Sequence, residues 1–207
     1  MADLALFDFD GTLTTGETFP AFVRSVVPGA RQRAARLRLA PLVVAYRLGL
    51  ASGTRVRAAV VREGLAGMDA AAFEAAAADW SRRELPAWLR PQALQRLRTH
   101  RERGDTVLVV SGNFEALLRP WAEAEGVQVA GSRLEVRDGG LTGRYAGPQC
   151  VLAEKVVRIR ELVDPSGFAR IHAYGDTPED RPMLLLADVA HYLPRGWPAG
   201  LASDRID

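Results

Sequence analysis

Two aspartates near the N-terminus are the first residues of this 207-residue chain that could do chemistry. Asp8 and Asp10 follow the apolar run Leu4–Phe7 and precede Gly11. Side chains alternate faces along a strand, so the two carboxylates would share a face if the strand stayed regular. Carboxylates at a buried strand end are costly unless a cation or donors compensate them, and Mg2+ prefers such oxygen ligands. The pair alone is equally compatible with an ordinary Asp-Gly turn after a strand.

Other polar residues follow apolar segments further along the chain. The stretch Ser111–Asn113 follows the apolar run 107–110, and Asp176 comes at the end of a further expected strand, 170–174. A run that is apolar on both faces indicates a parallel strand covered on both sides, and ligands bind at the carboxyl ends of such strands. Lys155 is the single lysine among 27 basic residues. A lysine is a compact point charge, which suits a phosphoryl oxygen beside a carboxylate.

Four motifs, in this order, make the chain resemble the haloacid dehalogenase superfamily of phosphohydrolases, in its phosphoserine-phosphatase-like branch. They are Asp8–Thr14, Val109–Asn113, Cys150–Lys155 and Tyr174–Asp180. The matches run from residue 8 to residue 180, so the resemblance covers nearly the whole chain. It implies an α/β fold with a doubly wound, Rossmann-like, mostly parallel sheet. It also implies Mg2+-dependent hydrolysis of a phosphate monoester.

The resemblance assigns roles to the acidic residues of these motifs. Asp8 is the expected nucleophile, which forms an aspartyl-phosphate, and Asp10 is the general acid that then activates water. Mg2+ is expected between Asp8, the backbone carbonyl of Asp10 and Asp176. Asp180 follows Asp176 by one helical turn, and it is expected to hold a metal-bound water or Lys155. Dehalogenases of the superfamily lack the second aspartate, so Asp10 argues against dehalogenation.

The same resemblance assigns the binding of the substrate. Ser111, the Gly112 amide and Lys155 are expected to hold phosphate oxygens, at the start of a helix that favours anions. Asn113 is expected to contact the substrate as well.

Two glutamates bear on the rest of the substrate. Phosphoserine phosphatases have a glutamate that binds the substrate amine at the position matching Glu17. Alternatively, Glu17 is an acid favoured by a helix N-terminus. Those enzymes also have an asparagine three positions after Asp176, where this chain has Glu179, so the local electrostatics are expected to differ.

Alternation of strands and helices predicts the doubly wound α/β core, with a helical cap inserted after the first strand. Helices are expected over 17–27, 30–50, 54–65 and 70–84, before the core resumes near Pro91. We therefore expect residues 1–14 and 87–207 to form the core and residues 15–86 to form the cap. A second, smaller insert is expected as a hairpin over 132–146.

Composition narrows the classes of protein further. Cys150 is the only cysteine and there are three histidines, so a disulfide framework or a Cys/His metal site is not expected.

The charge is distributed unevenly along the chain. Residues 15–63 hold nine arginines and two acids in a chain of net charge +2, which suggests an anionic substrate or surface. The basic residues lack interleaved aromatics, so nucleic acid is not an expected partner. The start of the chain has no secretory pattern, which predicts a cytoplasmic location, with peripheral contact at the inner face of the membrane left open.

The apolar segment Leu37–Ala51 leaves three interpretations open. It is about 15 residues long, against the roughly 20 that span a bilayer. A buried or domain-facing helix, an interfacial membrane helix preceded by arginines, and a true span are all compatible with it. Pro41 is expected to kink or divide it.

The leading hypothesis is a Mg2+-dependent phosphomonoesterase that acts on a small phosphorylated metabolite such as a phosphoserine-like compound. A phospholipid phosphatase is the first alternative, because the basic, apolar cap and residues 192–196 resemble phosphatidylglycerophosphate phosphatases. A phosphotransferase of the same fold would share every motif. A non-catalytic binding module of the same fold is a further alternative, and the intact set Asp8, Asp10, Ser111, Lys155, Asp176 and Asp180 argues against it. The sequence does not indicate an oligomeric state.

Overall fold

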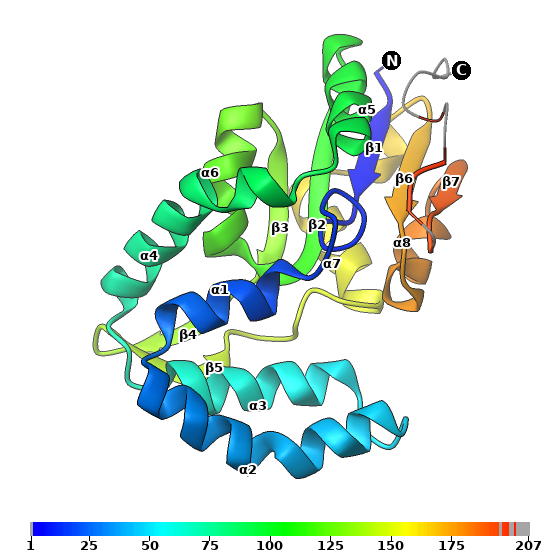
Figure 1. The fold of residues 1–207 in the computed structure, drawn as a ribbon. Coiled ribbons are helices and arrows are strands. Elements are labelled where there is room, and N and C mark those ends of the chain that lie inside the picture. The colour runs from blue at the N-terminus through cyan, green and yellow to red at the C-terminus, as the bar shows by residue number, and fades with distance from the viewer. Residues whose placement is uncertain (1, 195, 199–200, 202–207) are drawn as a thin grey trace.

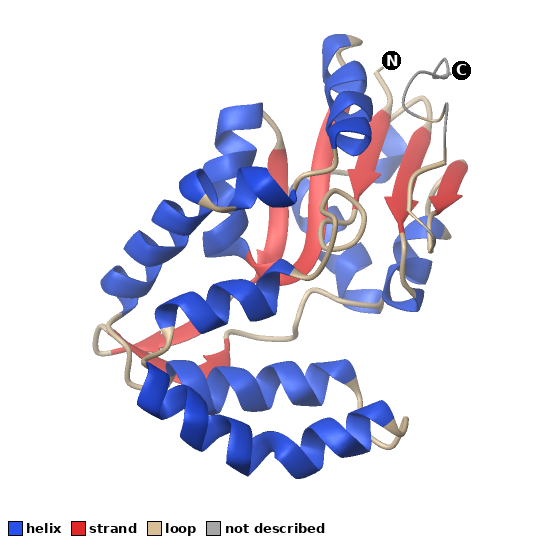
Figure 2. Ribbon diagram, in the orientation of Figure 1, coloured by secondary structure: helices blue, strands red, loops and turns tan. Residues whose placement is uncertain are grey.

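A five-stranded parallel sheet forms the centre of the molecule in the computed structural model, which describes residues 2–194, 196–198 and 201 (Figures 1 and 2). The strands lie in the order β3-β2-β1-β6-β7. Their bounds are β1 (Leu4–Phe7), β2 (Thr106–Phe114), β3 (Gln128–Ser132), β6 (Ile171–Gly175) and β7 (Val189–Tyr192). Phe7 lies level with Val109 on one side and Tyr174 on the other, so the three central strands are aligned where β1 ends. The predicted doubly wound α/β core is confirmed.

Helices cover both faces of this sheet because alternate strand residues are apolar on both sides. Phe7 and Val109 pack on one face with α5 (Pro91–Glu102) and α6 (Glu115–Glu125). Leu6 and Val110 pack on the other face with α7 (Ala153–Leu162) and the short α8 (Arg181–Leu184). The sheet is thus buried on both sides, and its strand ends are the accessible edge.

Four helices lie between β1 and α5, where the cap was expected. They are α1 (Thr18–Val26), α2 (Gly29–Arg47), α3 (Gly53–Leu65) and α4 (Ala70–Arg83), followed by the 3-10 turn Leu85–Trp88. Helices α1 and α4 pack on the core through a cluster of aromatic rings, in which Phe22 meets Phe73, Trp80 and Phe114. Helices α2 and α3 form a hairpin that packs on the two-stranded sheet β4 (Leu134–Arg137) and β5 (Gly140–Tyr145) (Figure 1). The division of the chain at residues 15 and 86 stays a prediction.

The segment Leu37–Ala51 differs from what we expected. One helix, α2, runs through Pro41 without being divided there, and it ends at Arg47, short of Ala51. Pro41 is exposed, so water can satisfy the carbonyl that its missing N–H leaves without a partner. The helix faces α3 on one side, but none of its residues is buried. Within the described part of the chain, no helix has the length and apolar character needed to cross a bilayer.

Two strands also depart from the sequence-based prediction. Strand β3 was not predicted, because Gln128–Ser132 is only five residues long and its polar and apolar residues do not alternate clearly. Strand β2 continues through Ser111–Asn113 to Phe114, where we expected it to end, with a register shift against β3 after Val110. The predicted helices around α3, α4, α5 and α6 and the hairpin over 132–146 are present. Of the segment 192–196, Arg195 lies outside the described residues.

Candidate active site

The residues singled out from the sequence meet at the carboxyl edge of the three central strands. Asp8 follows β1, Ser111 lies in the last part of β2, and Asp176 follows β6. The amide of Asp8 still donates to the Tyr174 carbonyl at 2.9 Å, so the ladder between β1 and β6 fixes its backbone. Lys155 lies on α7, on the face of the sheet where Leu6 and Val110 are packed. Parallel register alone therefore brings residues more than a hundred positions apart to one place.

A buried ammonium group ties this edge together. Lys155 is 1% exposed, and its Nζ donates to Asp8 Oδ1 and to Asp180 Oδ1, each at 2.5 Å. Burial alone would lower the pKa of Lys155, but the two carboxylates outweigh it and raise that pKa. Burial raises the pKa of Asp8, while the ammonium group opposes this. Lys155 therefore stays charged and holds both carboxylates.

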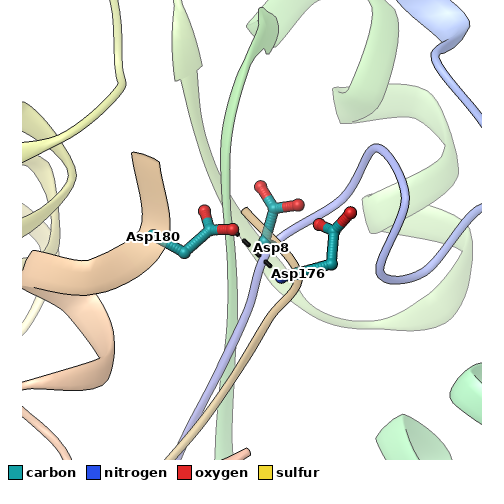
Figure 3. A group of neighbouring side chains, drawn as sticks. All are labelled: Asp8, Asp176 and Asp180. Carbon is teal, nitrogen blue, oxygen red and sulfur yellow. Dashed lines mark hydrogen bonds between the residues drawn. The ribbon is translucent and has the colours of Figure 1, made fainter. Parts of the chain in front are cut away.

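Figure 3 shows the three carboxylates of this site, Asp8, Asp176 and Asp180, gathered together. One ligand oxygen from each of Asp8, Asp176 and Asp180 lies within 4.8 Å of the others. The other oxygen of Asp180 accepts from the amides of Asp176 and Thr177 at 3.1 and 2.9 Å, which fixes the loop after β6. Three carboxylates and one ammonium leave a formal charge of −2. A hard divalent cation such as Mg2+ fits both the oxygen donors and the missing charge.

The turn after β1 holds Asp176 in place from the other side. Thr12 donates its hydroxyl to Asp176 Oδ1 at 3.0 Å. Gly11 has a φ of +86°, and a Cβ there would lie 2.2 Å from Asp176 Oδ2. Only glycine allows both this backbone conformation and this close approach. The Asp-Gly pair is therefore part of the carboxylate site as well as a turn.

Asp10 points to a different set of partners. Its Oδ1 accepts from the amide and the hydroxyl of Thr18 at 3.1 and 2.5 Å, and its Oδ2 accepts from Asn113 Nδ2 at 3.0 Å. Thr18 is the first residue of α1, and the N-cap residue Glu17 makes no side-chain cap. Asp10 therefore caps α1 from a distance. Burial raises the pKa of Asp10 and these hydrogen bonds oppose the rise, so its carboxyl group holds a proton more readily than a free aspartate does.

A small pocket opens in front of these residues. Asp8, Asp10, Lys155, Ser111 and Gly112 all line it. A Cβ on Gly112 would lie 2.7 Å from the Val151 side chain, so a larger residue does not fit there. The structure thus brings the residues predicted to perform the chemistry into one pocket with those predicted to hold phosphate.

The outer wall of the pocket combines helix α3 with the segments around Gln149 and Glu179. Arg57 of α3 donates to both oxygens of Glu179 at 3.0 Å, and also to Gln149 Oε1 at 3.0 Å. Glu17 lines the same pocket. Desolvation, together with the charge of Asp10, raises the pKa of Glu17 to about 7, while Arg57 opposes the rise.

The sequence did not indicate two residues of this site. Thr18 carries no signal, because a threonine at a helix start is common. Arg57 was one of nine arginines in its segment, and nothing in the pattern separated it from the others. Only the crossing of α3 over the sheet edge brings it to Glu179.

Comparisons with known proteins agree with this geometry. The family model of haloacid dehalogenase-like hydrolases matches residues 5–185. Protein CicA of Caulobacter vibrioides is 36% identical over 199 residues, which cover 95% of this chain and 88% of that protein. A phosphoserine phosphatase of Mycobacterium tuberculosis is 30% identical over 87% of this chain, which spans only 41% of that protein. A protein of unknown function from Bordetella pertussis Tohama I has a TM-score of 0.80 at 26% identity, covering 98% of this chain and 94% of its own.

We expect Gly11→Ala to disturb the carboxylate site, and Gly49→Ala is the matched control. Both glycines have positive φ, but a Cβ on Gly49 meets nothing within 4 Å. Gly49→Ala should cost about 1–2 kcal/mol of stability, from backbone conformation alone. Gly11→Ala should cost more in urea unfolding and should weaken Mg2+ binding in calorimetry, because Asp176 must move. Equal costs and equal Mg2+ affinities would contradict this account.

We expect Lys155→Met to lower the free energy of unfolding in urea by about 3–5 kcal/mol, because it leaves buried carboxylates without their cation. The measurement is made in the presence of a chelator, so that no metal replaces the lost charge. Asp8→Asn in the same background should recover part of the loss, since it removes one of the buried carboxylates left without a cationic partner. An unchanged unfolding midpoint for Lys155→Met would show that the ion pairs contribute no net stability.

Proposed function

The chain belongs to the haloacid dehalogenase-like hydrolase family, and we propose that it is a phosphatase. It would hydrolyse a small phosphate monoester through an aspartyl-phosphate on Asp8. One observation carries this proposal: the buried Lys155 ammonium lies between Asp8 and Asp180, with Asp176 beside them. A phosphate monoester is an anion that repels nucleophiles, so a carboxylate can attack it only where cationic groups neutralise the charge.

The proposed reaction has two steps. An Asp8 carboxylate oxygen attacks phosphorus while the bond to the leaving oxygen breaks, and Asp10 gives its proton to that oxygen. Water then attacks the phosphorus of the aspartyl-phosphate, Asp10 takes a proton from the water, and inorganic phosphate leaves as Asp8 is restored. The raised pKa of Asp10 supports the first of its two roles, because a general acid must carry a proton.

The remaining pocket residues would hold the phosphoryl group and the metal. Lys155, the Ser111 hydroxyl and the Gly112 amide would bind phosphoryl oxygens. Asp8 and Asp176, with the backbone carbonyl of Asp10, would bind Mg2+, which when bound neutralises phosphoryl charge. Asp180 would keep Lys155 and the Asp176 loop in position, as its hydrogen bonds to both indicate.

The outer wall of the pocket supports a narrower class of substrate. Arg57 is already paired with Glu179 and hydrogen-bonded to Gln149, so its positive charge is satisfied within the protein. Among the described residues Glu17 has no cationic partner at salt-bridge distance, so its carboxylate, when ionised, adds a negative charge to this wall. A leaving group with an amine and no carboxylate fits this wall better than phosphoserine, whose carboxylate would compete with Glu179 for Arg57.

The chemistry is tested by phosphate release from a panel that includes phosphoserine, phosphoethanolamine, histidinol phosphate, sugar phosphates and phosphatidylglycerophosphate. We expect turnover to require Mg2+ and to fall by at least about 10³-fold in Asp8→Asn, as for loss of a covalent nucleophile. Asp69→Asn is the control, because Asp69 caps α4 through the Ala72 amide outside the pocket. Turnover by Asp8→Asn at the wild-type rate would rule out an aspartyl-phosphate.

The substrate class is tested separately with Glu179→Gln, which frees Arg57. We expect the kcat/KM ratio of phosphoserine to phosphoethanolamine to rise by about tenfold, within what one charge-assisted hydrogen bond contributes. Glu179→Asp keeps the charge and should leave the ratio close to that of the wild type. A wild-type preference for phosphoserine, or a ratio insensitive to Glu179→Gln, would contradict this assignment while leaving the chemistry intact.

A further inference from the structure

Helix α2 presents an apolar stripe to solvent. No residue of this helix, all of which the structure describes, is buried, and Leu37 and Val44 are 79% and 54% exposed. Leu48 and Leu50, just beyond its end, are 68% and 75% exposed. Leu37, Pro41, Val44 and Leu48 recur at spacings of four, three and four residues, so they follow one side of the helix. An exposed apolar row of this kind marks an interaction surface.

Arginines flank this stripe and no acid lies on the helix. The arginines of α2 are Arg31, Arg33, Arg36, Arg38 and Arg47. Arg31 donates to backbone carbonyls of α3 and of the residue after it, and Arg38 pairs with Glu63. The other three find no acidic partner among the described residues. Arg36 and Arg47 also line an apolar groove with Val23, Leu39 and Val43, between α1, α2 and α3.

We propose that α2 and the loop Leu48–Ser52 bind the surface of an anionic membrane. The apolar stripe would enter the boundary between headgroups and acyl chains, and the flanking arginines would contact lipid phosphates. Shallow burial of an apolar helix face, with basic residues attracted to anionic lipids, is how peripheral proteins bind membranes. The proposal concerns binding alone and does not require a lipid substrate.

A second copy of the chain fits this surface less well. A two-fold contact through α2 would bring the arginines of one copy close to those of the other. Among the described residues Arg33, Arg36 and Arg47 have no acidic partner, and α2 itself carries no acid, so juxtaposed like charges would disfavour association. An anionic surface supplies the opposite charge along the whole stripe.

The surface also adjoins the pocket. The loop Leu48–Ser52 leads directly into Gly53 of α3, and a Cβ on Gly53 would lie 3.5 Å from Glu179 Oε1. The same hairpin therefore carries the apolar stripe on α2 and Arg57 of the pocket wall on α3. Binding through α2 would hold the pocket next to the membrane.

The experiment is co-sedimentation of the full chain with vesicles of phosphatidylcholine alone or mixed with phosphatidylglycerol, over a series of salt concentrations. We expect binding only to the anionic vesicles, decreasing with salt. Leu48→Glu with Leu50→Glu should lower the partition coefficient by at least about tenfold, from lost apolar burial and added negative charge. Val157→Glu with Leu185→Glu is the matched control, because it adds the same charge at exposed apolar sites away from α2.

A second pair of variants separates charge from apolar contact. Arg33→Gln with Arg36→Gln should weaken binding by about an order of magnitude, since each basic residue near an anionic surface contributes a severalfold effect.

No sedimentation with anionic vesicles at low salt would overturn the proposal, as would equal losses in the α2 variant and the control. A dimer in analytical ultracentrifugation that Leu48→Glu with Leu50→Glu dissociates, without vesicle binding, would assign the surface to a second copy instead. None of these readouts depends on phosphatase activity.

Discussion

The buried ammonium of Lys155 is the interaction on which the site depends. Asp8 and Asp180 come from separate segments, and each would be costly to bury without a cation. Lys155 donates to both from α7, and Asp180 in turn accepts from the two amides that open the loop after β6. One positive charge thus fixes β1, α7 and the end of β6 relative to one another. Three carboxylates gather around this one ammonium group, so the cluster keeps a net negative charge. This excess charge makes it a site for a divalent cation.

The two aspartates of the first motif are separated by environment although they are two positions apart. Asp8 meets the Lys155 ammonium, whereas Asp10 meets the amide and hydroxyl of Thr18 and the amide of Asn113. Burial raises the pKa of both carboxyl groups, and it is opposed by a cation at Asp8 and by neutral donors at Asp10, so the two aspartates differ in their partners. In many active sites two neighbouring carboxyl groups lie in different environments, and this lets one act as the nucleophile and the other as the general acid. Since Thr18 begins α1, the same contact ties the start of the cap to the proposed acid.

Sequence reasoning succeeded where backbone periodicity alone carries a residue to its place. Short strands were predicted before Asp8, Ser111 and Asp176, and parallel strands bring their carboxyl ends to one edge. It failed where the outcome depends on packing between distant segments. Strand β3 is stabilised by pairing with β2 rather than by its own composition. Arg57 reaches Glu179 only because α3 lies across the sheet edge, and α2 passes Pro41 because that side of the helix is exposed.

The uneven distribution of charge along the chain has a structural explanation in the α2–α3 hairpin. Its two helices use arginine in different ways. On α3, Arg57 faces inward and is neutralised by Glu179, so it links the hairpin to the core at the pocket. On α2, Arg33, Arg36 and Arg47 have no acidic partner among the described residues and flank exposed leucines. Arginines that only stabilised the cap would be expected to pair within it, as Arg38 and Arg62 do with Glu63. The outer arginines gain no such stabilisation from the fold, and this is the reason to look outside the chain for the anions that they bind.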